Sequence, residues 1–210
     1  MTDFDRLREQ MVQRQLVARG VRDQRVLSAM RSVRRHEFVD ARNQSAAYDD
    51  RPLPIGFGQT ISQPYIVAWM TELLCIKPDD VVLEIGTGCG YQTAILAQLA
   101  KHVFSIELNA ELSAQAALNL SRAGVGNATL NVGDGYEGWA EHAPYPCILV
   151  AAAPVTVPKA LTRQLAAGGR LVLPVGRSGQ QEMRRIIRQR DGTLTDESLG
   201  AVAFVPLVRG

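Results

Sequence analysis

The chain has 210 residues, of which 46% are hydrophobic and 21% are charged, proportions typical of soluble globular proteins rather than disordered or fibrous ones. Its 23 basic and 21 acidic residues give a formal net charge of +2, and this balance argues against nucleic acid as a partner. The three cysteines are widely spaced and lack a CxxC pair, so we expect neither a disulfide framework nor a thiolate metal site.

The sequence also gives no indication of membrane attachment or metal binding. It contains no run of about 18 apolar residues, and residues 1–15 carry charges throughout, so we expect no membrane partner and a cytoplasmic location. The three histidines are too scattered to pair at helical spacing, and no carboxylate cluster joins them, so we expect no metal. We interpret Arg31, Arg34 and Arg35 as solvated side chains on one face of a helix.

The N-terminal part of the chain is expected to contain helices and a long loop. Apolar residues at helical spacing in residues 4–16, followed by Gly20, predict an amphipathic helix with a glycine cap. Asp23 is the expected N-cap of a second, short helix. Prolines and glycines punctuate residues 43–64, where embedded apolar residues favour an ordered active-site loop over disorder. A helix is expected to follow at residues 66–74.

Strand and helix patterns alternate through the middle of the chain. We expect strands at residues 81–85, 102–106, 128–132, 147–152 and 170–175, and helices at residues 91–100, 110–123 and 159–167, the last ended by Gly168 and Gly169. This alternation implies right-handed crossovers and a parallel sheet covered on both faces, which explains why the strands are nearly unbroken apolar runs.

The pattern changes near the C-terminus, where residues 182–189, a turn at residues 191–192 and the apolar run 201–208 predict antiparallel strands at the edge of the sheet. The expected fold class is therefore α/β, a Rossmann-like, doubly wound, mostly parallel sheet with antiparallel C-terminal strands and an N-terminal helical extension. We expect one domain over residues 1–210, comprising helices and the active-site loop (1–75), a cofactor-binding core (76–176) and the C-terminal strands (177–210).

Glycines follow the first strand of this core at a spacing that indicates a nucleotide-like ligand. Gly86, Gly88 and Gly90 allow backbone conformations and a close ligand approach that a Cβ would block. The dinucleotide fingerprint is G-x-G-x-x-G, whereas the third glycine here comes one residue early. The acid-x-G-x-G-x-G pattern that begins at Glu84 and includes Thr87 instead resembles the first motif of the class I S-adenosylmethionine methyltransferases.

Two further acidic residues fall at the ends of expected strands. Glu107, about 20 residues beyond the glycine turn, can accept both hydrogen bonds from a ribose diol. Asp134, followed by Gly135, ends the third expected strand, and the resemblance to the class implies that it receives the adenine amine. Because ligands bind at the carboxyl ends of strands in open α/β sheets, we predict that these residues and Glu84 share one cofactor site.

A segment before the glycine turn is more specific. Residues 53–65, LPIGFGQTISQPY, closely resemble the signature loop of the protein-L-isoaspartate O-methyltransferases, and resemblance to the bacterial form extends across nearly the whole chain. The resemblance implies S-adenosyl-L-methionine as the cofactor, and peptides and proteins that contain L-isoaspartyl residues as the partners. It further implies methylation of the free α-carboxylate of that residue, giving an ester that collapses to a succinimide and begins repair.

The same resemblance implies roles for individual residues. Ser62 is the candidate catalytic hydroxyl donor, because attack by an already ionised carboxylate needs positioning rather than a strong general base. Gln59, Thr60 and Ile61 are expected to close over the methionine end of the cofactor. The expected groove for an extended peptide is formed by Pro54, Ile55, Gly56, Val205, Pro206 and Leu207.

Three other hypotheses remain open. One is a methyltransferase of the same fold for another carboxylate or small molecule. The second is a family member that binds cofactor or damaged protein without turnover, suggested by Pro146, Ala151 and Cys89, at which the chain departs from the usual family pattern. The third, a nicotinamide-dependent oxidoreductase, is disfavoured by the glycine spacing.

Overall fold

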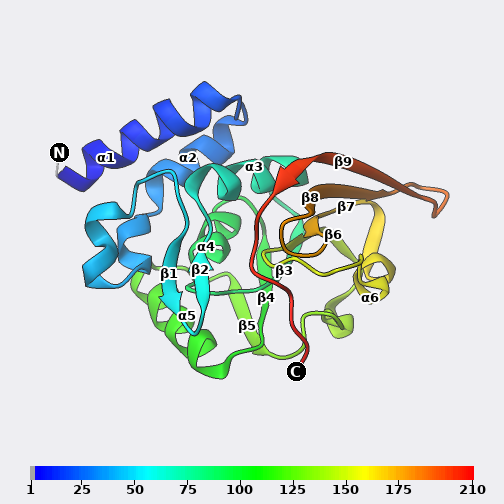
Figure 1. The fold of residues 1–210 in the computed structure, drawn as a ribbon. Coiled ribbons are helices and arrows are strands. Elements are labelled where there is room, and N and C mark those ends of the chain that lie inside the picture. The colour runs from blue at the N-terminus through cyan, green and yellow to red at the C-terminus, as the bar shows by residue number, and fades with distance from the viewer. Residues whose placement is uncertain (1–2) are drawn as a thin grey trace.

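The structure, a computed structural model, describes residues 3–210 and is built around one seven-stranded sheet (Figure 1). The strands lie in the order β5-β4-β3-β6-β7-β8-β9, and their bounds are β3 (Val81–Ile85), β4 (His102–Glu107), β5 (Ala128–Val132), β6 (Tyr145–Val150), β7 (Leu165–Val175), β8 (Gln181–Arg188) and β9 (Leu194–Val202). The strands from β5 to β7 are parallel, whereas β8 and β9 are antiparallel. The expected Rossmann-like α/β fold with antiparallel C-terminal strands is confirmed.

Helices cover both faces of the sheet, and each face buries its own apolar cluster. On one face, Val82 and Leu149 pack with α3 (Pro64–Leu74), α4 (Tyr91–Ala97), α5 (Ala110–Arg122) and the N-terminal helices. On the other face, Leu83 and Ile148 pack beneath α6 (Lys159–Arg163). Because alternate residues of β3 and β6 enter different clusters, these strands are apolar along their length except at Glu84. None of the described helices has the length and apolar character needed to cross a bilayer.

The N-terminal helices lie beside this sheet, as the sequence predicts. The first helix begins with α1 (Asp3–Met11), continues through a π-helical turn and a 3-10 turn, and ends at Gly20, whose φ is 95°. Asp23 caps α2 (Gln24–Ser32), and its side chain accepts hydrogen bonds from the backbone amides of Arg25 and Val26. Arg35, in the next 3-10 turn, is fully buried, so its interpretation as a solvated side chain is wrong.

The expected active-site loop is ordered and contains a small hairpin that is not among the elements expected from the sequence. Strands β1 (Leu53–Gly56) and β2 (Gln59–Ile61) pair antiparallel, with Leu53 opposite Ile61. Both of these side chains are buried and therefore anchor the hairpin in the core. The strands are too short to show alternation, and Pro54 is compatible only with an edge position, so the sequence signal was weak.

The expected helix over residues 159–167 is wrong beyond Arg163. Leu165 already begins β7, and Gly168 and Gly169 lie inside that strand instead of capping a helix. The pairing of β6 with β7 is irregular here, and a Cβ on Gly169 would come within 3.0 Å of the carbonyl oxygen of Tyr145. The glycine therefore permits a close backbone approach at a bulge, which has the same sequence signature as a helix cap.

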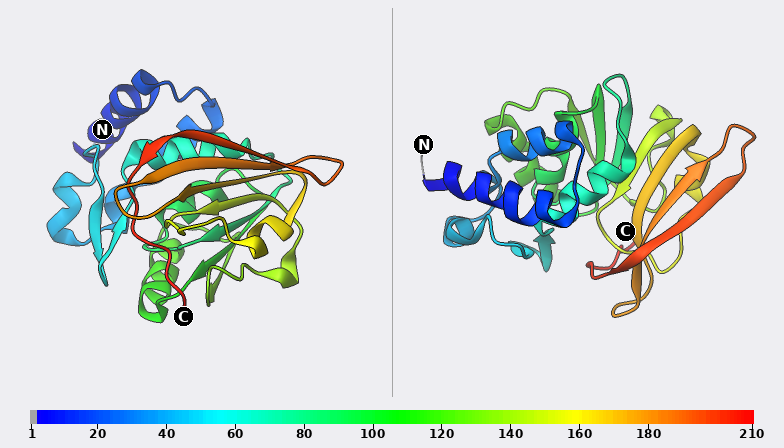
Figure 2. Two further views of the ribbon diagram at one scale, coloured as in Figure 1. Left: turned by 45° about the vertical axis from the view of Figure 1, so that its right-hand side comes forward. Right: turned by 90° about the horizontal axis from the view of Figure 1, so that it is seen from above.

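The expected strand at residues 201–208 is also misplaced, because β9 ends at Val202. The remaining segment leaves the sheet and runs across the carboxyl ends of the central strands, as Figures 1 and 2 show. One isolated bridge, between Ala153 and Pro206, fixes its path. The other expected elements differ from the structure by a few residues at their ends.

Candidate functional site

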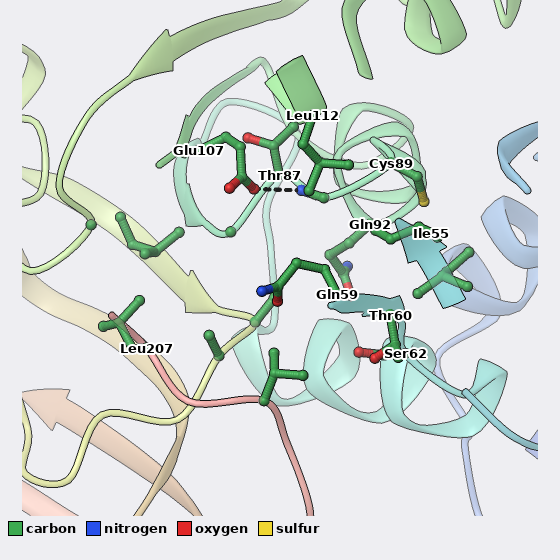
Figure 3. A pocket seen from close by; sticks show the side chains of 18 of the residues that line it. Ile55, Gln59, Thr60, Ser62, Thr87, Cys89, Gln92, Glu107, Leu112 and Leu207 are labelled. Carbon is green, nitrogen blue, oxygen red and sulfur yellow. Dashed lines mark hydrogen bonds between the residues drawn. The ribbon is translucent and has the colours of Figure 1, made fainter. Parts of the chain in front are cut away.

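A pocket of about 900 Å³, a volume that includes space open to solvent, lies at the carboxyl ends of β3, β4 and β6. The glycine turn after β3, the β1–β2 hairpin and the segment after β9 form its walls (Figure 3). This position is where open α/β sheets bind ligands. We call it the main pocket.

The structure brings most of the predicted site residues together in this pocket. Those that line it are Ile55, Gln59, Thr60, Ile61, Ser62, Gly86, Thr87, Gly88, Glu107, Gly135, Val205, Pro206 and Leu207. Those that lie outside its lining are Pro54, Gly56, Glu84, Gly90 and Asp134. No group of His, Cys, Asp or Glu side chains suited to a metal ion occurs within residues 3–210.

The glycine turn has the geometry that its spacing predicts. Gly86, Gly88 and Gly90 all have positive φ, at 89°, 55° and 89°. A Cβ on Gly88 would lie 3.3 Å from Cδ1 of Ile55, which belongs to the hairpin across the pocket. Gly90 instead packs against Leu120 of α5, so its role is to bring α4 close to α5. The first two glycines thus keep the floor of the pocket open to a ligand.

Among the described residues that line the main pocket, Glu107 is the only charged one, and it is held at the end of β4. Its Oε2 accepts a hydrogen bond from the amide of Gly88 at 2.9 Å, and its Oε1 accepts one from the amide of Asn109 at 3.1 Å. The side chain is 8% exposed. Because each carboxylate oxygen has a second lone pair, Glu107 can still accept two hydroxyl groups from a ligand.

Glu84 lies behind the pocket. Its carboxylate is fully buried, and Oε2 accepts hydrogen bonds from the hydroxyls of Thr93 and Ser105 at 2.5 and 2.7 Å. Burial raises the pKa of Glu84 from 4.5 to about 7, although the two hydroxyl donors lower it. Oε1 has no hydrogen-bond partner among residues 3–210. Glu84 therefore organises the strand ends around the glycine turn.

Asp134 lies at the outer edge of the pocket, near the C-terminal segment. Its Oδ1 accepts a hydrogen bond from the amide of Tyr136, and its Oδ2 is 3.5 Å from a guanidinium nitrogen of Arg209. The Tyr136 hydroxyl donates to the carbonyl of Leu207 at 3.2 Å. The segment that lines the pocket is thus fastened to the turn after β5, in which Asp134 precedes the lining residue Gly135.

A second hollow adjoins the main pocket. It is lined by Pro52, Thr60, Ser62, Gln63, Ile66, Ala151, Ala203, Phe204 and Val205, and we call it the side pocket. Four residues, Thr60, Ser62, Ala151 and Val205, line both pockets. In Figure 3 the hydroxyl groups of Thr60 and Ser62 lie on the same wall, on the far side of the pocket from Glu107. Ligands bound in the two pockets would therefore lie next to each other at this wall.

Several lining residues were not assigned to the site from sequence. Cys89, Tyr91 and Gln92 line the wall that continues from the glycine turn into α4, and Ala151 follows β6 at the boundary of the two pockets. From the sequence alone, Cys89 and Ala151 stand out only as departures from a family pattern. The available signals were the position of Cys89 beside the glycine motif and that of Ala151 directly after an apolar strand.

Comparison with known proteins agrees with this arrangement. A sequence model of the Protein-L-isoaspartate(D-aspartate) O-methyltransferase family matches residues 6–210. The chain belongs to this family. The resemblance seen in residues 53–65 is therefore confirmed.

Relatives within the family match over almost the full chain. The protein-L-isoaspartate O-methyltransferase of Synechococcus sp. (strain JA-2-3B'a(2-13)) is 52% identical, covering 98% of this chain and 86% of that protein. The protein of the same name from Methylorubrum populi is 50% identical, covering 100% of this chain and 98% of that protein.

Solved structures of family members share the fold. A protein-L-isoaspartate O-methyltransferase structure superposes with a TM-score of 0.85 at 29% identity, covering 95% of this chain and 65% of that one. A Plasmodium falciparum structure, described as a putative family member in complex with S-adenosyl-L-homocysteine, gives a TM-score of 0.83 at 24% identity and covers all of both chains. At that identity the second likeness supports the fold alone.

Proposed function

We propose that this protein transfers a methyl group from S-adenosylmethionine to the free α-carboxylate of L-isoaspartyl residues in damaged proteins, the first step of repair through a succinimide. The observation that carries the proposal is the shared wall of the main and side pockets, which contains the Ser62 hydroxyl. Family membership supports the substrate class.

The main pocket fits the proposed cofactor. Glu107 offers two acceptor oxygens suited to a ribose diol, and the apolar side chains of Ile106, Leu108 and Leu112 lie close to it in the lining, as an adenine ring requires. A Cβ on Gly135 would collide with Ile85, so the backbone approaches closely at this wall. The bound cofactor would supply an electrophilic methyl group on a sulfonium.

The residues of this chain would contribute mainly orientation and exclusion of water. An α-carboxylate is ionised at neutral pH, so no side chain needs to remove a proton from it. We assign Ser62 the role of donating a hydrogen bond to one carboxylate oxygen, which leaves the other free to attack. Thr60 lies beside it, and Gln59 and Ile61 close the wall.

The side pocket and its surroundings suit an extended peptide. The backbone of Pro54, Ile55 and Gly56 belongs to an edge strand. Val205, Pro206 and Leu207 line the main pocket together with Ile55, and Val205 also lines the side pocket. Exposed strand edges of this kind bind peptides through main-chain hydrogen bonds. We also include in the proposal a cytoplasmic location, in keeping with three free cysteines among residues 3–210.

The test uses three peptides that differ at one residue, containing isoaspartate, aspartate or isoaspartate with its α-carboxylate converted to an amide. With methyl-labelled S-adenosylmethionine, we expect base-labile label on the first peptide alone. Label on the amide peptide would show that the methyl group is transferred to a group other than the α-carboxylate. Cofactor binding by calorimetry with no labelled product from any peptide would support a binding protein instead, and the assignment as an enzyme would fail.

A further inference from the structure

Arg35 is a buried cation that no part of the proposed reaction uses. It is 0% exposed, and its Nε donates a hydrogen bond of 2.7 Å to the carbonyl of Ala47. Its Nη1 and Nη2 have no hydrogen-bond partner in the described part of the chain, where Arg35 also forms no ion pair. Burying a charge without a counter-charge is unfavourable, and the hydrogen bond to Ala47 and the cation–π contact with the Tyr91 ring offset part of that cost.

This cation lies directly behind the wall of the main pocket. The guanidinium carbon of Arg35 is 4.9 Å from the ring centroid of Tyr91, which lines the pocket. Cys89, which also lines it, is close enough that the charge of Arg35 partly offsets the rise that burial causes in the pKa of its thiol. Burial lowers the pKa of Arg35, but a guanidinium stays protonated in proteins.

Among the described residues that line the main pocket, none is a lysine, arginine or histidine. Figure 3 shows Cys89 on the side of Ile55 and Gln92, away from Glu107. If the ribose of a ligand lies at Glu107 and its base lies against Leu108, the amino-acid end extends across the pocket toward Cys89, the side on which Arg35 lies behind Tyr91.

We propose that Arg35 is a positioning residue, whose buried charge makes the amino-acid end of the main pocket selective for a ligand that carries a carboxylate. This inference rests on the proposed function, because it takes an amino-acid-bearing nucleoside as the ligand. A fixed charge in a low-dielectric interior acts through intervening side chains without direct contact, so Tyr91 and Cys89 can separate the two groups.

The experiment compares two ligands that differ in this one group. S-adenosylhomocysteine carries a carboxylate and an ammonium, and its decarboxylated analogue carries the ammonium alone. Titration calorimetry gives the ratio of their dissociation constants for the wild type, Arg35→Met, Arg35→Lys and the exposed neighbour Arg34→Met. The ratio is unaffected by the fraction of a variant that is unfolded, since that fraction lowers both apparent affinities equally.

We expect Arg35→Met to reduce the preference for the carboxylate about tenfold, Arg35→Lys to retain most of it, and Arg34→Met to leave it unchanged. An unchanged ratio in Arg35→Met would overturn the inference. A second measurement needs no variant: the wild-type preference should persist in 1 M salt, because a buried charge is screened little. Its loss in salt would assign the preference to surface charges and likewise overturn the inference.

The failure of the inference is distinguishable from failure of the proposed function. If the wild type binds S-adenosylhomocysteine and methylates the isoaspartyl peptide while the Arg35→Met ratio is unchanged, only the role of Arg35 is refuted. If the wild type binds neither ligand, the proposed function fails and the role of Arg35 fails with it.

Discussion

The amide of Gly88 donates a hydrogen bond of 2.9 Å to Oε2 of Glu107, and this contact joins the glycine turn after β3 to the end of β4. The two residues come from neighbouring parallel strands, so the pairing of β3 with β4 sets their separation. A carboxylate that is already held by two backbone amides needs no reorganisation to receive a diol. This preorganisation makes Glu107 the residue on which cofactor affinity should depend most.

Glu107→Gln is therefore expected to weaken binding of S-adenosylhomocysteine by about 10- to 100-fold, because hydrogen bonds to a charged group contribute about 1.5–3 kcal/mol. Calorimetry on the folded variant measures this directly. The matched control is Glu111→Gln, an exposed carboxylate in the first turn of α5 that should bind like the wild type. Equal weakening in both variants would mean that net charge, and not the contact with the ribose, is responsible.

Ser62→Ala tests the shared wall. We expect kcat to fall about 10²-fold, at the low end for loss of a positioned donor, while the dissociation constant for cofactor changes little. Rapid-quench measurement of peptide methylation separates the effect on kcat from the effect on cofactor binding. Ser178→Ala, in an exposed turn, should leave both quantities unchanged. Full turnover by Ser62→Ala would remove Ser62 from the mechanism.

The sequence predicted the cofactor half of this site better than the rest. Glycine spacing and acids at strand ends are local signals, and the sheet then brings Gly86, Gly88 and Glu107 together. The hairpin depends on burial of Leu53 and Ile61, a tertiary effect that produces no recognisable sequence pattern in strands this short.

The errors have a common physical origin. Gly168 and Gly169 permit a bulge against β6, yet two adjacent glycines are also typical of a helix cap. The apolar residues after Val202 line a pocket, yet an apolar run is also typical of a strand. Arg35 gave no sign of burial, because one arginine among several looks solvated until the packing of its neighbours is known. A local sequence pattern shows neither which segment a glycine packs against nor which surface an apolar run covers.

Glu84 predicts an unusual dependence of stability on pH. Its pKa rises from 4.5 to about 7 on folding, mainly through burial, so the folded state holds the proton more tightly than the unfolded state. The carboxyl is neutral in both states below pH 4.5 and therefore contributes no penalty there. As the pH rises from about 4.5 to 7, ionisation reduces the free energy of unfolding by up to about 3 kcal/mol, and the loss is complete above pH 7.

Glu84→Gln removes this titration. We expect the free energy of unfolding of the variant, relative to wild type, to increase by about 2–3 kcal/mol between pH 4.5 and pH 8, whatever constant offset the amide introduces. Urea unfolding across this range measures the difference. Glu111→Gln serves again as the exposed comparison and should show no such trend. A flat difference for Glu84→Gln would show that the buried carboxyl titrates normally.

Gly135→Ala tests how tightly the backbone closes on the main pocket. A Cβ at this position would collide with Cγ2 of Ile85 and lie 3.5 Å from Cδ1 of Leu207. Ile85 is β-branched and buried at the end of β3, so moving its Cγ2 aside is costly, and we expect a loss of about 1–3 kcal/mol in unfolding free energy. Gly126→Ala is the control, since its Cβ would meet nothing within 4 Å. Because Leu207 also lines the pocket, Gly135→Ala should weaken S-adenosylhomocysteine binding as well. If the variant is destabilised but binds with wild-type affinity, this wall contributes to packing and does not contact the ligand.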